Sequence, residues 1–119
     1  MKGLPAVEEQ HGHDDWLELK LRVDAHCPWF EGHFPGQPIL PGVVQIGWAA
    51  WFAARWTGHE VPPTLLTRIK FKRPVRPGAR LTLRLQNRAG KLSFEFLADT
   101  PEGPASVSSG SFAVADVAS

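Results

Sequence analysis

Cysteine is almost absent from this chain, with Cys27 alone among 119 residues. A single cysteine excludes an internal disulfide, and it leaves Cys27 without the second thiol that metal-site spacing requires. Free cysteine behaves as a small hydrophobic side chain. We therefore expect Cys27 to be a buried or half-buried filler of the protein interior.

Long apolar runs are also missing. No uninterrupted run approaches the roughly 20 residues that a transmembrane helix needs, and the N-terminus lacks the basic and apolar parts of a secretory signal. We expect a cytoplasmic protein with no membrane partner. The hydrophobic share of 43% and the charged share of 21% are typical of a folded globular chain. The length predicts one domain over residues 1–119, and a domain this small favours association with a second subunit.

Acidic residues are absent from Val61 to Phe94, where nine lysines and arginines occur. Residues 1–60 carry eight acidic and four basic side chains, so the net charge of +1 hides a strong segregation. A basic surface attracts nucleic acid, an acidic protein or a phosphate-bearing ligand. Because no recognised nucleic-acid-binding motif or interleaved aromatic pattern accompanies the charge, we expect no nucleic-acid partner.

Hydrophobic periodicity predicts the first half of the fold. Residues 1–14 are polar and are expected to be a loose lead-in. Apolar and polar residues alternate over 16–23, as in a strand with one face exposed to water. Prolines and glycines make 25–41 an irregular, stiff loop. Residues 42–56 are apolar except at Gln45 and Arg55, and Gly58 is a natural stop, which predicts a helix buried on every side.

Antiparallel strands are predicted for the second half. In the strand within 65–75, Thr67, Ile69 and Phe71 are expected on one face, with Arg68, Lys70 and Lys72 on the other. Residues 81–86 and 92–97 form a hairpin, and 105–114 complete a sheet of five or six strands. The sequence therefore predicts an α+β fold in which one long central helix is wrapped by a curved antiparallel sheet.

The run from His33 to Gly42, His-Phe-Pro-Gly-Gln-Pro-Ile-Leu-Pro-Gly, indicates an active site. A histidine transfers protons near neutral pH. Gly42 begins the predicted helix, whose first backbone N–H groups are free to bind a carbonyl oxygen. A histidine in a turn can also have no chemical role.

The segment from Phe30 to Val43 resembles the signature of the FabA/FabZ-type 3-hydroxyacyl-(acyl-carrier-protein) dehydratases, which are hot-dog folds. The segment from Arg68 to Gly78 is similar to their second hallmark, a strand that ends in a Pro-Val-x-Pro-Gly turn. The continuation from Val43 to Trp48 most resembles the ApeI-like branch of aryl polyene biosynthesis.

The resemblance implies removal of water from a 3-hydroxyacyl thioester of an acyl carrier protein to give a trans-2-enoyl thioester, without a cofactor. It implies that His33 takes the C2 proton and that the N–H of Gly42 binds the thioester carbonyl. The family's general acid, however, should stand at position 47, where this chain has Gly47. The family glutamine one helical turn later is Trp51 here.

Three readings of this gap stay open. In the first reading, Glu31 substitutes for the missing acid. The alternative for Glu31 is an ordinary solvated carboxylate without a catalytic role. In the second reading the chain forms a heterodimer with another hot-dog subunit that supplies the acid, where a homodimer would lack it. In the third, the protein binds acyl chains without catalysis or is a hot-dog thioesterase.

Candidate binding residues follow from the same resemblance. The candidates for the lining of an acyl tunnel are the apolar residues Phe30, Ile39, Leu40, Trp48, Trp51 and Phe52. The two tryptophans would favour a flat, conjugated acyl chain. Aromatic residues at helical spacing are, however, also typical of a protein core. The candidates for carrier-protein binding are the basic residues Arg68, Lys70, Lys72, Arg73, Arg76 and Arg80. The alternative is that these residues form an ordinary solvent-exposed strand face.

A metal site is the weakest alternative. His11, His13, Asp14 and Asp15 form a small group of possible ligands, but a His-x-His pattern in a polar lead-in is unspecific, and we expect no metal. His26 and His59 are expected at the surface.

Overall fold

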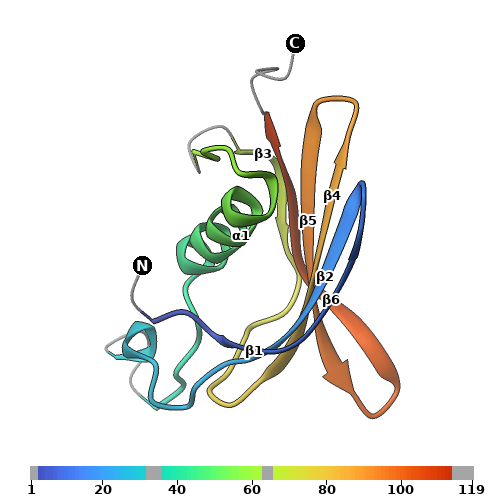
Figure 1. The fold of residues 1–119 in the computed structure, drawn as a ribbon. Helices are drawn as coiled ribbons and strands as arrows, with labels where there is room; N and C mark the ends of the chain where they lie inside the picture. The colour runs from blue at the N-terminus through green and yellow to red at the C-terminus, as the bar shows by residue number, and fades with distance from the viewer. Residues whose placement is uncertain (1–2, 32–35, 63–65, 114–119) are drawn as a thin grey trace.

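The computed structural model describes residues 3–31, 36–62 and 66–113. One long helix lies against a curved sheet of six antiparallel strands, in the order β1-β2-β4-β5-β6-β3 (Figure 1). This arrangement confirms the predicted α+β fold. The elements are β1 (Ala6–His13), β2 (Trp16–Arg22), the short 3-10 helix η1 (Pro28–Phe30), α1 (Gly42–Thr57), β3 (Leu66–Phe71), β4 (Arg80–Arg88), β5 (Lys91–Thr100) and β6 (Gly103–Ala113).

Strand alternation builds the inner face of the sheet. Leu19 on β2 pairs with Leu83 on β4, which pairs in turn with Phe96 on β5. Paired residues point to the same face of a sheet, and all three side chains are buried in the core. The predicted strand over 16–23 and the predicted hairpin are therefore confirmed. The last predicted strand is confirmed as β6.

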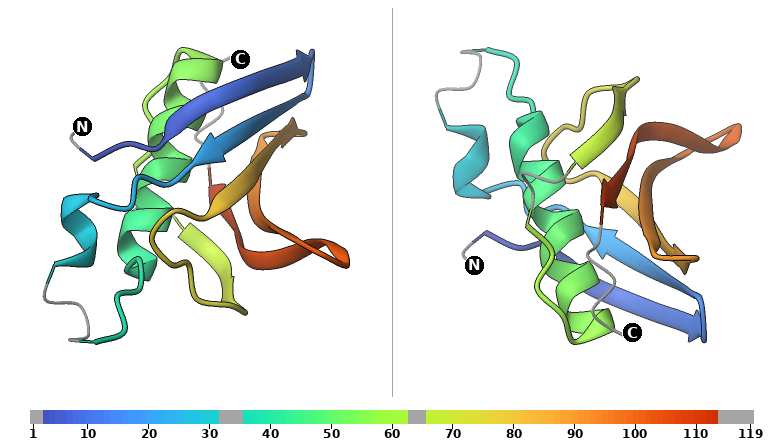
Figure 2. Two further views of the ribbon diagram at one scale, coloured as in Figure 1. Left: turned by 90° about the horizontal axis from the view of Figure 1, so that it is seen from below. Right: turned by 90° about the horizontal axis from the view of Figure 1, so that it is seen from above.

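The helix α1 ends where the sequence predicts. Gly58 adopts the left-handed conformation with φ of 75°, and its N–H donates to the carbonyl of Ala54 at 2.8 Å, the usual role of a glycine after a helix. The prediction of burial on every side is wrong, because the sheet covers only one side of α1 (Figure 2). Trp48 is fully buried on the covered side, whereas Val43 is 76% exposed on the other.

The N-terminal segment is not a loose lead-in. Ala6–His13 forms β1 and pairs with β2 from Ala6 opposite Arg22 to His13 opposite Trp16. All eight side chains of β1 are exposed. The strand therefore lacks the apolar alternation on which the sequence prediction depended, and backbone pairing holds it in place.

A β-bulge breaks the predicted alternation of β3. Thr67 pairs with Ser111 and Lys70 with Ser109, so the register shifts between them, and Arg68 has a φ of 56°. An extra residue in one strand re-aims its neighbours. Consequently Arg68, Ile69 and Lys70 all border one hollow on the outer face of the sheet, and the predicted separation of apolar and basic faces fails in this part of the strand.

Ion pairs neutralise the cations of β4. Arg80 contacts Glu8 at 2.6 Å, Arg84 contacts Glu18 at 2.9 Å, and Arg88 contacts Asp15 at 2.9 Å. Exposed pairs of this kind add roughly 0–1 kcal/mol each to stability, so their main effect is on charge distribution. The cations that form no ion pair with any described residue and lie exposed on β3 and the turn after it are Arg68, Lys70, Lys72, Arg73 and Arg76.

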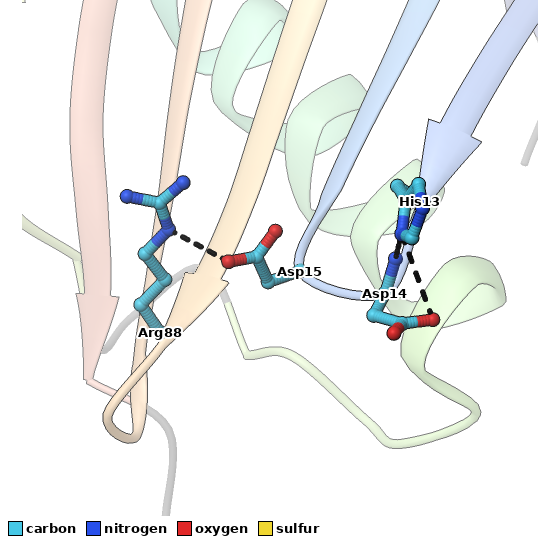
Figure 3. Close-up of polar contacts among 4 residues, drawn as sticks. All are labelled: His13, Asp14, Asp15 and Arg88. Carbon is cyan, nitrogen blue, oxygen red and sulfur yellow. Dashed lines mark hydrogen bonds and ion pairs between the residues drawn. The ribbon is translucent and has the colours of Figure 1, made fainter.

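The polar group at the β1–β2 turn does not converge on one point. Asp15 points toward Arg88, while His13 and Asp14 contact each other (Figure 3). Across residues 3–31, 36–62 and 66–113, no three His, Cys, Asp or Glu side chains are grouped so as to hold a metal ion. Cys27 is buried, and His26 and His59 are exposed, as predicted. None of the helices in these ranges is long and apolar enough to cross a bilayer.

Candidate active site

The site is built around the start of α1. Pro41 precedes the helix, and its carbonyl accepts the N–H groups of Val44 at 3.1 Å and Gln45 at 3.3 Å. The N–H groups of the first residues, Gly42 and Val43, have no acceptor within a helix. Proline offers no side-chain cap, and the first turn carries no acidic residue. The positive end of the helix dipole is therefore left free for an incoming oxygen.

Two backbone hydrogen bonds hold the Pro-Val-x-Pro-Gly turn, one to the chain that enters the helix and one to the residue after β2. The N–H of Leu40 donates to the carbonyl of Val75 at 2.8 Å, which joins the His33–Gly42 run to the Pro-Val-x-Pro-Gly turn. In addition, Gly78 N–H donates to the carbonyl of Val23 at 3.0 Å. The two sequence hallmarks thus lie side by side and support each other.

Gln45 supports the same segment from inside the core. Its side chain is only 3% exposed. Its Nε2 donates to the carbonyl of Leu40 at 3.5 Å, and its Oε1 accepts from Ser108 Oγ at 2.7 Å. Sequence reasoning treated Gln45 only as a polar interruption of the helix. Because buried polar groups are nearly always hydrogen-bonded, a glutamine in an apolar helix was itself a signal of such a partner.

A groove of about 490 Å³ opens at the helix start. The ring of Phe71 from β3, which also lines the groove, packs against Gly42, since a Cβ atom added at Gly42 would lie 2.6 Å from Phe71 Cζ. Only a glycine at this position leaves the Phe71 ring where it is. None of the described lining residues is Asp or Glu. The lining comprises Ile39, Leu40, Pro41, Gly42, Val43, Gln45, Ile46, Phe71, Lys72, Arg73 and Pro74.

The predicted acyl-binding residues are divided between three places. Ile39 and Leu40 line the groove. Phe30 and Trp48 are buried in the core. Trp51 borders a second cavity of about 400 Å³ between α1 and the β1–β2 hairpin, together with Phe52 and neighbouring side chains. The structure therefore brings two of the six candidates, Ile39 and Leu40, to the groove at Gly42.

Of the positions considered for the acid and the base, the structure describes Glu31 and Gly47 but not His33. His33 lies outside the described residues. Glu31 is exposed, and its N–H donates to the carbonyl of Pro28 at 3.2 Å. Gly47 lies one helical turn after Val43, on the side of α1 that the sheet leaves uncovered. A carboxylate at position 47 would therefore project away from the core of its own chain.

A long helix in a curved antiparallel sheet, with a glycine at the helix start above an apolar groove, defines a hot-dog protein. Solved structures agree. An uncharacterised protein from Erwinia carotovora subsp. atroseptica superposes with a TM-score of 0.78 at 30% identity over 100% of both chains. The dehydratase heterocomplex ApeI:P from Xenorhabdus doucetiae gives 0.78 at 28% identity, covering 92% of this chain and 96% of that one.

The chain belongs to the ApeI-like dehydratase family, whose model, described as ApeI dehydratase, matches residues 8–111. Among curated relatives, FabZ dehydratase from Blochmanniella pennsylvanica is 35% identical over 99 residues, covering 73% of this chain and 66% of that protein. FabZ from Syntrophobacter fumaroxidans is 37% identical over 72 residues, covering 54% of this chain and 49% of that protein. The chain thus spans about half to two thirds of the length of these relatives.

The link between Gln45 and Ser108 can be tested by a double-mutant cycle. Gln45→Leu leaves the buried Ser108 hydroxyl without its acceptor, and Ser108→Ala removes the hydroxyl. We expect Gln45→Leu to cost about 1–3 kcal/mol of unfolding free energy in urea denaturation, and the double variant to cost clearly less than the sum of the two single variants. Additive costs would show that the two side chains do not depend on each other.

Proposed function

We propose that this chain is one subunit of a 3-hydroxyacyl-(acyl-carrier-protein) dehydratase and that a different hot-dog subunit supplies the missing acid. The observation that carries the proposal is the groove at Gly42. It presents free helix N–H groups beside apolar side chains, yet its described lining contains no carboxylate. Such a site is suited to holding a thioester but lacks a proton donor for the leaving hydroxyl.

The proposed reaction assigns each proton. The thioester carbonyl oxygen accepts a hydrogen bond from Gly42 N–H, and the helix dipole stabilises the enolate-like charge that develops on it. His33 takes the proton from C2, the C2=C3 double bond forms, and the C3–O bond breaks. The departing hydroxide is protonated by an acid and leaves as water. The product is a trans-2-enoyl thioester.

The position of Gly47 supports a partner subunit as the source of that acid. Because position 47 faces away from the chain's own core, a side chain there would serve a site formed with a neighbour. A second copy of this chain would present the same glycine. The relative from Xenorhabdus doucetiae is described as a dehydratase heterocomplex, which supports the same arrangement here. The ApeI-like family and the FabZ relatives favour fatty-acid or aryl-polyene-type biosynthesis as the setting.

We propose direct contact with the acyl chain for Ile39, which lines the groove. Leu40 also borders the groove, but its side chain is buried in the core, so we propose that it supports the groove wall. Trp51 lies nine positions after Gly42, or about 14 Å along the helix axis at about 1.5 Å per residue. It would therefore meet only the distal part of a long chain. For Phe30 and Trp48, both in the core, the structure favours a supporting role.

The dehydratase proposal is tested with a 3-hydroxyacyl carrier thioester and enoyl absorbance. We expect the chain alone to turn over slowly or not at all, and a co-expressed hot-dog partner to raise the rate by about 10²- to 10⁴-fold, the usual value of one acid. His33→Ala should abolish that rate, whereas His26→Ala, at an exposed histidine, should not. Gly47→Asp should restore part of the rate to the chain alone, while the isosteric Gly47→Asn should not.

Two results would contradict the proposal. One is a wild-type chain that is inactive alone and with its partner, and stays inactive as Gly47→Asp; this outcome favours non-catalytic acyl binding. The other is full activity in His33→Ala.

We also propose that Lys72 and Arg73, which line the groove, receive the acidic carrier protein together with the exposed Arg76 of the adjoining turn. A carrier docked on these three cations would sit beside the mouth of the groove, where its thioester must enter. Electrostatic contacts of this kind act mainly on encounter and binding.

If the carrier protein docks on these cations, reversing their charge should change KM and leave kcat nearly unchanged. Lys72→Glu with Arg73→Glu should raise the KM for the carrier-linked substrate about tenfold, with little change in kcat. The KM for a neutral pantetheine thioester should not change, because that substrate lacks the acidic protein. Lys91→Glu is the control at an exposed cation away from the groove. An equal effect on both substrates would mean that the two cations act on the groove itself.

A further inference from the structure

A hollow of about 670 Å³ lies on the outer face of the sheet, the face that points away from α1 (Figure 1). Arg84 and Glu95 line it, and along their strands they alternate with the core residues Leu83 and Phe96. The hollow shares no described lining residue with the groove at Gly42. The proposed dehydratase reaction therefore leaves this part of the surface without a role.

The strand register sets cations at the two ends of one row across the hollow. Arg84 on β4 pairs with Glu95 on β5. Glu95 pairs in turn with Ser109 on β6, which pairs with Lys70 on β3. Neighbouring strands lie about 4.8 Å apart, so the backbones of the two cationic residues stand about 14 Å apart. Their long side chains can therefore reach an elongated anion from both ends.

Polar donors occupy the space between the cations. In the next row, Gln86 on β4 pairs with Ser93 on β5, and Ser93 pairs with Ser111 on β6. The hydroxyls of Ser93, Ser109 and Ser111 form no hydrogen bond to any described residue. Serine hydroxyls and the glutamine amide are donors for an anionic oxygen. The middle of the hollow is therefore suited to an oxygen-rich ligand.

Positive charge exceeds negative charge in the lining. The charged residues that line the hollow are the cations Arg68, Lys70, Arg84 and Lys91 and the one carboxylate Glu95. Arg84 is also held by Glu18 at 2.9 Å, whereas the other three cations form no ion pair with any described residue. Three cations are therefore available to an anion, and one carboxylate opposes it.

The hollow is a poor match for an apolar ligand. Of its large apolar side chains, Ile69 is 38% exposed and Phe94 only 3% exposed. Side chains project from the faces of a sheet, whereas strands pair in its plane. A strand added beside β3 would consequently leave this outer-face hollow open to a ligand.

We propose that the hollow binds a chain of phosphate groups, as in inorganic triphosphate or a nucleoside triphosphate. Arg68 and Lys70 hold the phosphates from β3 and Lys91 holds them from β5, while the serine hydroxyls donate to the oxygens between them. Charge-assisted hydrogen bonds to phosphate are about twice as strong as neutral ones. The site is separate from the carrier docking proposed for Lys72 and Arg73, which line the groove.

Isothermal titration calorimetry of the whole chain with sodium triphosphate, ATP and adenosine, in the absence of Mg²⁺, tests the site. At about 0.1 M salt we expect triphosphate and ATP to bind and adenosine, which has no phosphate, not to bind. Equal affinities for the first two would support the phosphate chain alone as the ligand, and tighter binding of ATP would add the nucleoside. At about 1 M salt, where the Debye length is about 3 Å, both affinities should fall about tenfold or more.

Variants locate the binding in the hollow. Lys70→Gln with Lys91→Gln removes two of the unpaired cations and should weaken the binding of both phosphates at least about tenfold. The matched control, Lys72→Gln with Arg73→Gln, removes the same charge beside the groove and should leave the affinities nearly unchanged. Glu95→Gln removes the opposing carboxylate but keeps an accepting oxygen, so it should tighten binding about threefold or more.

The absence of saturable binding of triphosphate and ATP at millimolar concentration would overturn the inference. Equal losses in the two double variants would do so too, because the chain would then respond only to net charge, as would an affinity that Glu95→Gln leaves unchanged. Circular dichroism and melting temperature verify that the variants fold. Neither phosphate probe carries a thioester and the readout is binding, so this site and the dehydratase activity can fail independently of each other.

Discussion

The packing of one side of α1 against the inner face of the sheet is the constraint on which the rest of the structure depends. Trp48 and its neighbours on that side are buried against strands whose leucines and phenylalanines point inward. This packing sets the direction of the helix. The bonds from Leu40 to Val75 and from Gln45 to Ser108 then fix its first turn. Gly42 and Val43, whose N–H groups have no acceptor within the helix, consequently line the groove together with Phe71.

The same constraint makes the site incomplete. A helix covered on one side only has a second side, which carries Val43 and Gly47, and the sheet of the same chain does not reach it. Position 47, where the family acid is absent, and the cations of β3, which form no ion pair with any described residue, lie outside the core. A partner that is not another copy, as proposed above, would account for the absence of an acid at position 47.

Much of the fold could be predicted from the sequence, because a strand with one buried face shows a regular alternation of apolar and polar residues. The leucines of β2 and β4 alternate, and Gly58 ends the helix. Strand β1 could not be predicted, because its exposed side chains show no apolar alternation; backbone pairing with β2 and the ion pairs of Glu8 hold it in place. The bulge at Arg68 was missed for a related reason, because register depends on β6 and not on the local sequence. The prediction that the helix begins at Gly42 is confirmed, whereas the binding role of Gly42 stays a prediction. The contacts of Gln45, Ser108 and Phe71 join distant segments, so the local sequence could not show them. The role of His33 stays a prediction.

We propose that the first N–H groups of α1 bind the thioester carbonyl. Amide NMR of the ¹⁵N-labelled chain, titrated with a 3-hydroxyacyl pantetheine in which an amide replaces the thioester, measures this binding at single N–H groups. We expect the largest shifts at the N–H groups of Gly42 and Val43. Unchanged signals from these two groups, with the largest shifts at the indole N–H groups of Trp51 and Trp56 in the second cavity, would contradict it.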